Sequence, residues 1–353
     1  MTSSPDVAAP LQNLVALLPQ GWTAETPGAA DAPALTDLLR RHEEAGRGWP
    51  GASEADVLVD VDPEHDGTRE NVVVRDAEGR VLGWCTAHDR AAGRMLVALV
   101  VERRLDRGLA DRVAELLFGW ADEVAGVIGA RRGLDVQQVD SGAFADDDRQ
   151  HAWLERAGFT RVRTWWQMSR PVAAGEALDA EAKEGVRIRR VRRQGTGMPD
   201  EDVLRTVHDV LESAFADHFN SHEESFDEFL SRLREDPGHR WDHWWIAELV
   251  DGDGDVPEPA GALVGAVVRG DGGHPDGSYV EYIGVLQNAR GRGVAKSLLQ
   301  TIVADAAERG RDSVGLEVDA DSPTGADQLY VSMGWQTKYT TESWHRDVPV
   351  TQS

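Results

Sequence analysis

Residues 279–299 read Tyr279-Val-Glu-Tyr-Ile-Gly-Val-Leu-Gln-Asn-Ala-Arg-Gly-Arg-Gly-Val-Ala-Lys-Ser-Leu-Leu299. The stretch begins with an apolar run typical of a strand, passes through a short polar turn and ends in a helical pattern of apolar residues. A glycine-rich turn that enters a helix leaves backbone N–H groups unpaired, and the helix dipole adds about half a positive charge there. The stretch therefore predicts a strand, a turn and a helix, with a turn that can hold a pyrophosphate.

The residues of this turn are small where an anion would have to approach the backbone. Gly291, Gly293 and Ala295 leave the amides accessible to phosphate oxygens. The spacing matches neither the dinucleotide fingerprint G-x-G-x-x-G nor the phosphate loop that ends in G-K-[ST]. Taken alone, the glycines also fit an ordinary helix start after a flexible turn, so the neighbouring segments have to decide between the two.

Working outward, the second half of the chain predicts strands and helices in a fixed order. We expect strands at 186–191, 243–250, 260–268, 278–286, 313–318 and 335–346, and helices at 200–216, 225–234, 293–309 and 325–333. The first half repeats this order with strands at 21–25, 71–75, 81–87, 95–101, 134–139 and 159–168, and helices at 33–44, 110–124 and 151–157. The sequence therefore predicts an internal duplication.

The boundary between the two copies is marked by composition. The stretch from Ser169 to Gly185 is polar and contains proline and glycine, as linkers do. We place a first domain at residues 1–171, a linker at 172–185 and a second domain at 186–353. The predicted fold class is α+β, with two tandem domains that each hold a mixed, mostly antiparallel sheet flanked by helices.

The composition is that of a folded, acidic protein. Its 353 residues are 41% hydrophobic, and 62 acidic against 37 basic residues give a formal net charge of −25. This charge repels phosphate backbones and anionic lipids, so we expect no nucleic-acid or membrane partner. Residues 1–19 lack the pattern of a secretion signal, and no stretch approaches the ~20 apolar residues of a membrane span. We expect a cytoplasmic protein, and its shortage of lysine is typical of a GC-rich bacterial genome.

Metal and thiol chemistry find little support in the sequence. The single cysteine, Cys85, lies in an apolar stretch and is expected to be buried and inert. His218 and His222 have helical spacing but lack the glutamate of a zinc motif. Asp251-Gly-Asp-Gly-Asp255 is too short for a calcium loop and predicts a hairpin turn. We expect no metal site.

Two motifs together carry a family resemblance. Arg290-x-x-Gly293-x-Ala295 begins a helix, and after the next strand the chain reads Leu-Tyr330-Val-Ser-Met-Gly-Trp335. This pattern resembles the GNAT superfamily of acetyl-CoA-dependent N-acetyltransferases over residues 186–346. The tandem layout is similar to that of mycothiol synthases.

The resemblance implies how acetyl-CoA binds as co-substrate. Its pyrophosphate would lie on the amides of the turn, which comprises Arg290, Gly291, Arg292, Gly293, Val294 and Ala295. Its pantetheine arm would bond strand amides near Ile283 and Val285, which requires two central strands to splay apart. The N-terminal copy has Leu105 in place of the motif arginine and Leu154 in place of the tyrosine, so we expect it to be catalytically silent.

Two residues are candidates for catalysis. An amine attacks a thioester only when neutral, and an alkylamine pKa of ~10.4 leaves less than about one molecule in a thousand neutral at pH 7. Glu281 is the candidate general base, although an alternating strand does not show which face it occupies. Tyr330 is the candidate acid that protonates the leaving thiolate, with simple aromatic packing as the alternative.

The predicted function is transfer of an acetyl group from acetyl-CoA to a primary amine of a small molecule by direct attack on the thioester. The alternative is a CoA-binding or interaction module without turnover. The acceptor remains open among aminoglycosides, amino-sugar conjugates, polyamines, amino acids and protein N-termini. The protein is expected to be a monomer or a homodimer.

Overall fold

The computed structural model describes residues 8–61, 68–90, 93–178, 182–193, 195, 197–216, 224–250, 257–270, 275–322 and 325–351. The chain divides into two compact units. The first comprises Met1–Trp165 together with Tyr339–Ser353, and the second comprises Trp166–Lys338.

Both units are built from the same series of elements. After α1 (Ala8–Leu17), the first series is β1 (Thr23–Glu25), α2 (Ala32–Arg47), α3 (Glu54–Val61), β2 (Arg69–Arg75), β3 (Val81–Asp89), β4 (Arg94–Val101), α4 (Arg107–Arg131), β5 (Val136–Phe144), α5 (Asp148–Arg156) and β6 (Thr160–Pro171). The second is β7 (Val186–Arg190), α6 (Glu201–Phe215), α7 (Phe226–Glu235), β8 (His239–Leu249), β9 (Glu258–Val268), β10 (Gly277–Val285), α8 (Val294–Glu308), β11 (Ser313–Asp319), α9 (Ala326–Ser332) and β12 (Gln336–Pro349). The predicted duplication is confirmed, and α1 and α3 are two helices that the sequence did not predict.

Each unit holds a mixed sheet, as predicted. The strand order is β1-β2-β3-β4-β5-β12 in the first unit and β6-β11-β10-β9-β8-β7 in the second. The pairs β4·β5 and β10·β11 are parallel, whereas the neighbouring pairs β3·β4 and β9·β10 are antiparallel. One parallel pair therefore lies inside an otherwise antiparallel arrangement in each copy.

The units do not follow the expected domain limits at 171 and 186. The end of the chain, expected in the second domain, pairs with the first unit: Thr341–Pro349 of β12 aligns with Val136–Phe144 of β5. In exchange, residues 166–171 of β6 belong to the second unit. The reason is strand length, since β6 and β12 have 12 and 14 residues and each is divided between the units.

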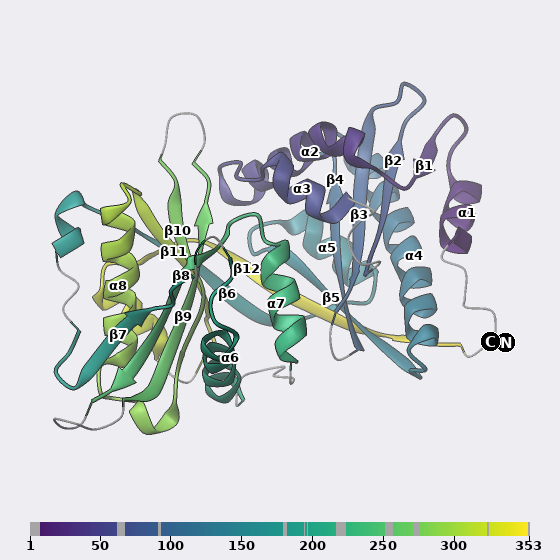
Figure 1. Cartoon of the computed structure of the whole chain (residues 1–353). Coiled ribbons are helices and arrows are strands. Elements are labelled where there is room, and N and C mark those ends of the chain that lie inside the picture. Colours follow the sequence, from purple (N-terminus) through teal and green to yellow (C-terminus); the bar gives the residue numbers. More distant parts are fainter. Residues whose placement is uncertain are drawn as a thin grey trace. The chain divides into compact units, whose positions relative to one another are not determined.

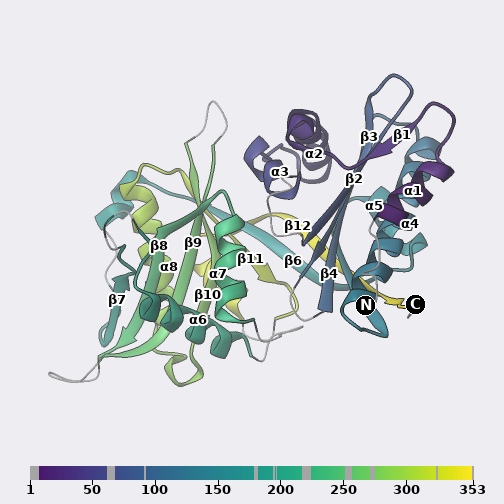
Figure 2. The same cartoon turned by 45° about the vertical axis from the view of Figure 1, so that its right-hand side comes forward.

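Helices cover both faces of each sheet. In the second unit, α8 covers one face, and α6 and α7 cover the other (Figure 1), with a separate apolar cluster under each layer. The first unit has the same arrangement, with α4 and α1 on one face and α2 and α3 on the other (Figure 2). Cys85 is fully buried, as expected, in the apolar cluster under α4. Burial raises the pKa of its thiol. None of the described helices is long and apolar enough to cross a membrane.

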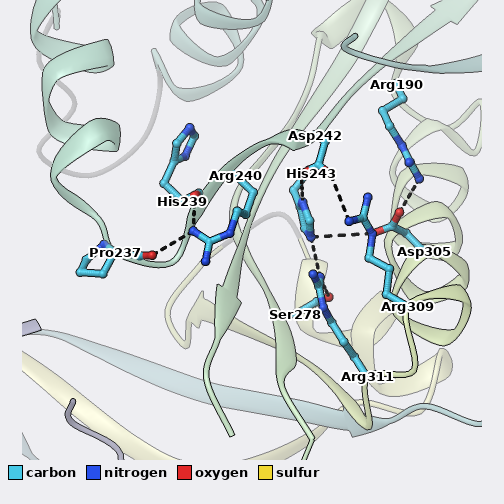
Figure 3. Close-up of polar contacts among 10 residues, drawn as sticks. All are labelled: Arg190, Pro237, His239, Arg240, Asp242, His243, Ser278, Asp305, Arg309 and Arg311. Atoms are coloured by element: carbon cyan, nitrogen blue, oxygen red, sulfur yellow. Dashed lines mark hydrogen bonds and ion pairs between the residues drawn. The ribbon is translucent and has the colours of Figure 1, made fainter. Parts of the chain in front are cut away.

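A buried polar network fixes the first residues of β10 (Figure 3). The ring of His243 on β8, 1% exposed, donates from Nδ1 to Asp242 at 2.7 Å and accepts at Nε2 from Arg311. Arg311 also donates to Ser278 Oγ on β10 at 2.8 Å. Burial lowers the pKa of His243, which agrees with a neutral ring that donates on one side and accepts on the other.

The same network reaches the end of α8 through Asp305 (Figure 3). Its side chain is 1% exposed, forms an ion pair with Arg309 Nε at 2.9 Å and accepts a hydrogen bond from Arg190 of β7. Removing one partner of a buried ion pair leaves the other charges without compensation. Asp305 therefore couples the helix to the edge of the sheet.

We expect Asp305→Ala to lower the free energy of unfolding by about 3 kcal/mol, because it leaves two arginines beside a buried imidazole. Urea denaturation followed by tryptophan fluorescence measures the change. Glu308→Ala, an exposed position on the same helix, is the control and should change the stability by less than about 0.5 kcal/mol. Equal effects of the two variants would contradict a stabilising network.

Candidate active site

The two central strands of the second unit part at the level of Glu281. β10 pairs with β11 only from Ser278 to Val280, although β10 continues to Val285. Its other neighbour, β9, stays paired up to Val285, with a bulge between Val280 and Tyr282. A bulge bends a strand and increases its twist, which accounts for the parting. Among the described strands, the last part of β10 therefore has a partner on one edge only.

The open edge of β10 presents alternate backbone amides. The amide of Leu286 donates to the carbonyl of Ala260 on β9 at 2.9 Å. Since amides of successive strand residues point to opposite sides, those of Ile283 and Val285 point away from β9, toward the open edge. The side chains of both residues pack against the apolar cluster under α8.

The turn after β10 leads into a helix without a side-chain cap. Gly291 and Gly293 have φ angles of +78° and +85°, in the left-handed region that favours glycine. Gly293 is the N-cap of α8, and no side chain of the described residues bonds to the helix as a cap. The first amides of α8, including those of Val294 and Ala295, therefore lack partners inside the helix. This helix end is suited to an anion.

Lys183 lies against the same helix end, although it comes from the segment before β7. Its backbone amide donates to Ser297 Oγ at 3.1 Å. A Cβ added to Gly293 would lie 2.5 Å from Cδ of Lys183. The chain contains three lysines, and two of them, Lys183 and Lys296, lie at the start of α8. The aliphatic part of Lys183 therefore lies over the glycine.

A pocket of about 220 Å³ lies beside the first turns of α8. It is lined by α8, by the end of α9, by the end of β6 and by the segment that follows β6, through Arg170, Glu176, Lys296, Gln300, Val303, Ser332 and Met333. Arg290 and Arg292 belong to the turn that immediately precedes α8. In a chain with a net charge of −25, this region concentrates positive charge, which favours an anionic ligand.

Glu281 is the bulge residue, and its carboxyl group lies near α7. Burial, the charge of Asp236 and a hydrogen bond with Asp236 raise the pKa of Glu281 to about 8, against the opposing effect of Arg232. No hydrogen-bond donor of the described residues reaches its buried Oε2. An ordinary glutamate has a pKa of ~4.3 and is ionised at pH 7, whereas the raised pKa of Glu281 favours its protonated form at that pH.

Arg232 is held in a fixed position near this carboxyl group. It donates to both carboxylate oxygens of Glu224, at 2.8 and 2.6 Å, and to the hydroxyl of Tyr282. Its guanidinium also lies 5.1 Å from the centre of the Tyr282 ring. Because Glu224 already pairs with this cation, Arg232 only partly offsets the rise in the pKa of Glu281.

Tyr330 lies on α9, within the apolar cluster that also contacts Ile283 and Val285. It is 7% exposed, and its ring lies 6.2 Å from that of Trp335, centre to centre. Burial raises the pKa of Tyr330 to about 12. The phenol is therefore protonated at neutral pH and able to donate.

The corresponding helix end in the first unit is capped. The side chain of Asp106 accepts from the amide of Leu109 at 3.0 Å at the start of α4. In the aligned motifs, Asp106 takes the place of Gly291. A carboxylate bound at this position already supplies the negative charge that the helix end favours and repels a second anion.

A buried ion pair joins the segments that follow β4 and β5 in the first unit. Arg103 pairs with Asp147, and His42 Nδ1 lies 2.9 Å from Arg103 Nη2. Burial and the charge of Arg103 lower the pKa of His42 to about 4. The neutral ring can therefore accept from the arginine.

Three residues at the site were not predicted from the sequence: Lys183, Arg232 and Asp236. Each reaches the site through a contact between distant segments, and no local pattern marks such contacts. The His218 and His222 pair and the turn at Asp251–Asp255, considered above for metal binding, lie outside the described residues.

Comparison with known sequences finds acetyltransferases. Residues 206–335 match the family model described as the acetyltransferase (GNAT) family. Mycothiol acetyltransferase of Frankia casuarinae is 30% identical over 284 residues, which cover 77% of this chain and 74% of that protein. Mycothiol acetyltransferase of Arthrobacter sp. is 25% identical over 258 residues, or 71% and 72% of the two chains.

Solved structures agree over nearly the whole chain. A GCN5-related N-acetyltransferase from Sphaerobacter thermophilus is 26% identical, with a TM-score of 0.72 over 94% of this chain and 97% of the other. A tandem GNAT protein from the clavulanic acid biosynthesis pathway, at 14% identity and a TM-score of 0.65, covers 94% and 99%. At that identity the second likeness shows the fold alone.

We expect Gly293→Ala to be more destabilising than Gly291→Ala. Both positions have positive φ angles, so the backbone cost of about 1 kcal/mol is shared. Only the Cβ at 293 meets Lys183, whereas nothing lies within 4 Å of a Cβ at 291. Urea denaturation of both variants measures the difference. Equal losses would show that Lys183 does not pack on the turn.

Proposed function

The chain belongs to the GNAT family of acetyltransferases, and we propose that it transfers the acetyl group of acetyl-CoA to a primary amine of a small molecule. The observation that carries the proposal is the end of β10. There, an open strand edge, a bulge with a buried carboxyl group and an uncapped helix start occur within 14 residues, from Glu281 to Val294. Anion binding, thioester binding and proton transfer are thus available from one continuous segment.

The residues at the start of α8 fit the pyrophosphate of acetyl-CoA. We assign this role to the turn formed by Arg290, Gly291, Arg292, Gly293, Val294 and Ala295. Its support is the missing side-chain cap and the two glycines with positive φ angles, which leave the amides open to phosphate oxygens. Strand amides of Ile283 and Val285 are assigned to the pantetheine arm, because they lie on the open edge of β10.

Glu281 is proposed as the general base that takes a proton from the acceptor ammonium. Proton transfer from an ammonium of pKa ~10.4 to an ordinary glutamate of pKa ~4.3 costs about 8 kcal/mol. A carboxylate with a pKa of about 8 reduces this cost to about 3 kcal/mol. The neutral amine then attacks the thioester carbonyl, so that a C–N bond forms and the C–S bond breaks.

Tyr330 is proposed as the acid that accompanies departure of the thiolate. Its raised pKa of about 12 keeps it protonated at every pH at which Glu281 titrates. Its support is its position in the cluster that contacts the open strand edge. The acid and the base would then titrate in separate pH ranges.

The first unit is proposed not to bind acetyl-CoA. Asp106 occupies its helix end, and Leu105 and Leu154 replace the motif arginine and tyrosine. The acceptor is proposed to be a small molecule, since the similar proteins carry the name mycothiol acetyltransferase. A mycothiol-type amine is therefore the first acceptor to test.

We expect acetyl-CoA to bind the wild-type chain at one site per chain in isothermal titration calorimetry. Gly293→Asp places a carboxylate and a Cβ at the proposed pyrophosphate position and should weaken binding at least about tenfold, or ~1.4 kcal/mol. Gly310→Asp is the control, because Gly310 also has a positive φ angle but lies at the other end of α8, where an added Cβ would meet nothing within 4 Å.

Each other outcome of this titration has a definite meaning. Two sites per chain would show that the first unit binds as well. Loss of binding in both variants would indicate that they are unfolded, and not that the pyrophosphate site at residues 290–295 has been lost. A wild-type chain that does not bind acetyl-CoA would overturn the proposed function.

We expect kcat/KM to rise with pH through about pH 8, because the base is active only when ionised and the pKa of Glu281 is raised to about 8. Glu281→Gln should lower kcat/KM by about 10²–10⁴-fold and remove this rise. Release of CoA thiol from acetyl-CoA with a panel of primary amines measures the rates. A rising limb that persists unchanged in Glu281→Gln would exclude Glu281 as the base.

A further inference from the structure

Glu281 and Asp236 form a pair of carboxyl groups that requires one bound proton. The charge of Asp236 and a hydrogen bond with its side chain both favour the protonated form of Glu281, and two ionised carboxylates would have no hydrogen to share. Oε2 of Glu281 is buried and meets no donor of the described residues. A hydrogen bond between the groups exists only if one of them carries a proton.

The turn that carries Asp236 is held rigidly against the sheet. Asp236 Oδ1 accepts from the amide of Gly238 at 2.7 Å, and the carbonyl of Gly238 accepts from the amide of Val267 on β9 at 2.8 Å. A Cβ on Gly238 would lie 2.4 Å from the Val267 carbonyl oxygen, so only glycine fits. The turn therefore fixes the position of the Asp236 carboxylate.

Arg240 also stabilises this turn through two hydrogen bonds (Figure 3). Arg240 Nη1 donates to the carbonyls of Pro237 at 2.9 Å and of His239 at 2.6 Å. Asp236 is also the residue that ends α7, which ties it to the helix that carries Arg232. With both ends held, Asp236 cannot swing away from Glu281 to relieve like-charge repulsion.

We propose that Asp236 is a positioning residue that shares one proton with Glu281 and thereby tunes it as the base for an acceptor ammonium. This inference rests on the proposed function. In the resting enzyme the pair holds one proton and one negative charge. Asp236 itself touches neither acceptor nor thioester in this scheme, and acts only through Glu281.

Besides Asp236, few charged groups lie near enough to Glu281 to change its pKa. On α7, Arg232 is the only other group that acts on Glu281 among the described residues. Across β9 the facing positions are Val264 and Gly265, which are uncharged. On β11, Glu317 accepts from Gln167. On α6, His208 lies 2.9 Å from the Glu224 carbonyl oxygen, and α8 covers the opposite face.

The proton balance of one turnover follows from this arrangement. When the pair loses its proton to water, two carboxylates face the incoming ammonium. One N–H proton passes from the ammonium to Glu281, which restores the singly protonated pair and leaves a neutral amine. Attack forms the amide, the amine's second proton goes to the sulfur with the help of Tyr330, and the products are the acetylated amine and CoA thiol.

Infrared spectroscopy of the whole chain tests the shared proton without any acceptor. A protonated carboxyl group gives a C=O band that is separate from ionised carboxylates. We expect a band near pH 7 that is missing in Glu281→Gln. In Asp236→Asn, which keeps an oxygen to accept from Gly238, the band should titrate away at a pH lower by at least about one unit. Asp227→Asn, an exposed charge change on the same helix, should leave it unchanged.

The pH dependence of kcat/KM provides a second test of the shared proton. The rising limb of kcat/KM should move to lower pH in Asp236→Asn by the same amount as the infrared band, with KM for acetyl-CoA unchanged. A band that titrates identically in wild type and Asp236→Asn, or a wild-type spectrum without a Glu281 band, would overturn the inference. A wild type with the band but no acetyl transfer to any amine would instead overturn the proposed function alone.

Discussion

The bulge at Glu281 is the constraint on which the rest of the site depends. Because β10 turns away from β11 at this residue while it stays paired with β9, one strand edge opens in the middle of a sheet. The same bend directs a carboxyl group toward α7 and the amides of Ile283 and Val285 toward the gap. Without the bulge, the parallel pairing would continue and close the edge. A local backbone irregularity thus creates both the binding surface and the base.

Much of the fold could be predicted from the sequence, because apolar periodicity and glycine positions are local signals. The order of strands and helices, the duplication and the start of α8 all follow from such patterns. The short helices α1 and α3 did not produce a strong enough pattern. The exchange of β6 and β12 between units was missed because the composition of a linker shows where the chain is polar, not which strands pair.

At the site, the division between predictable and unpredictable residues has the same cause. The residues of the turn before α8 follow one another in the chain, so a motif shows them together. Asp236 lies 45 positions from Glu281, and their contact depends on a turn held by Gly238 against Val267. The chain has 62 acidic residues, and no local sequence pattern distinguishes Asp236 from the others. Its effect on a neighbour's proton affinity becomes visible only in three dimensions.

The division of β12 between the units has a consequence for biosynthesis. The strand that pairs with β5 on its outer side comes from residues 341–349, after all other elements of the second series. During translation the first unit therefore leaves the ribosome with an open sheet edge, which can close only after the second series of elements has been synthesised. Exposed edges invite pairing with other chains. The two copies descend from one repeated pattern, but their folding is joined into a single event that neither half can complete alone.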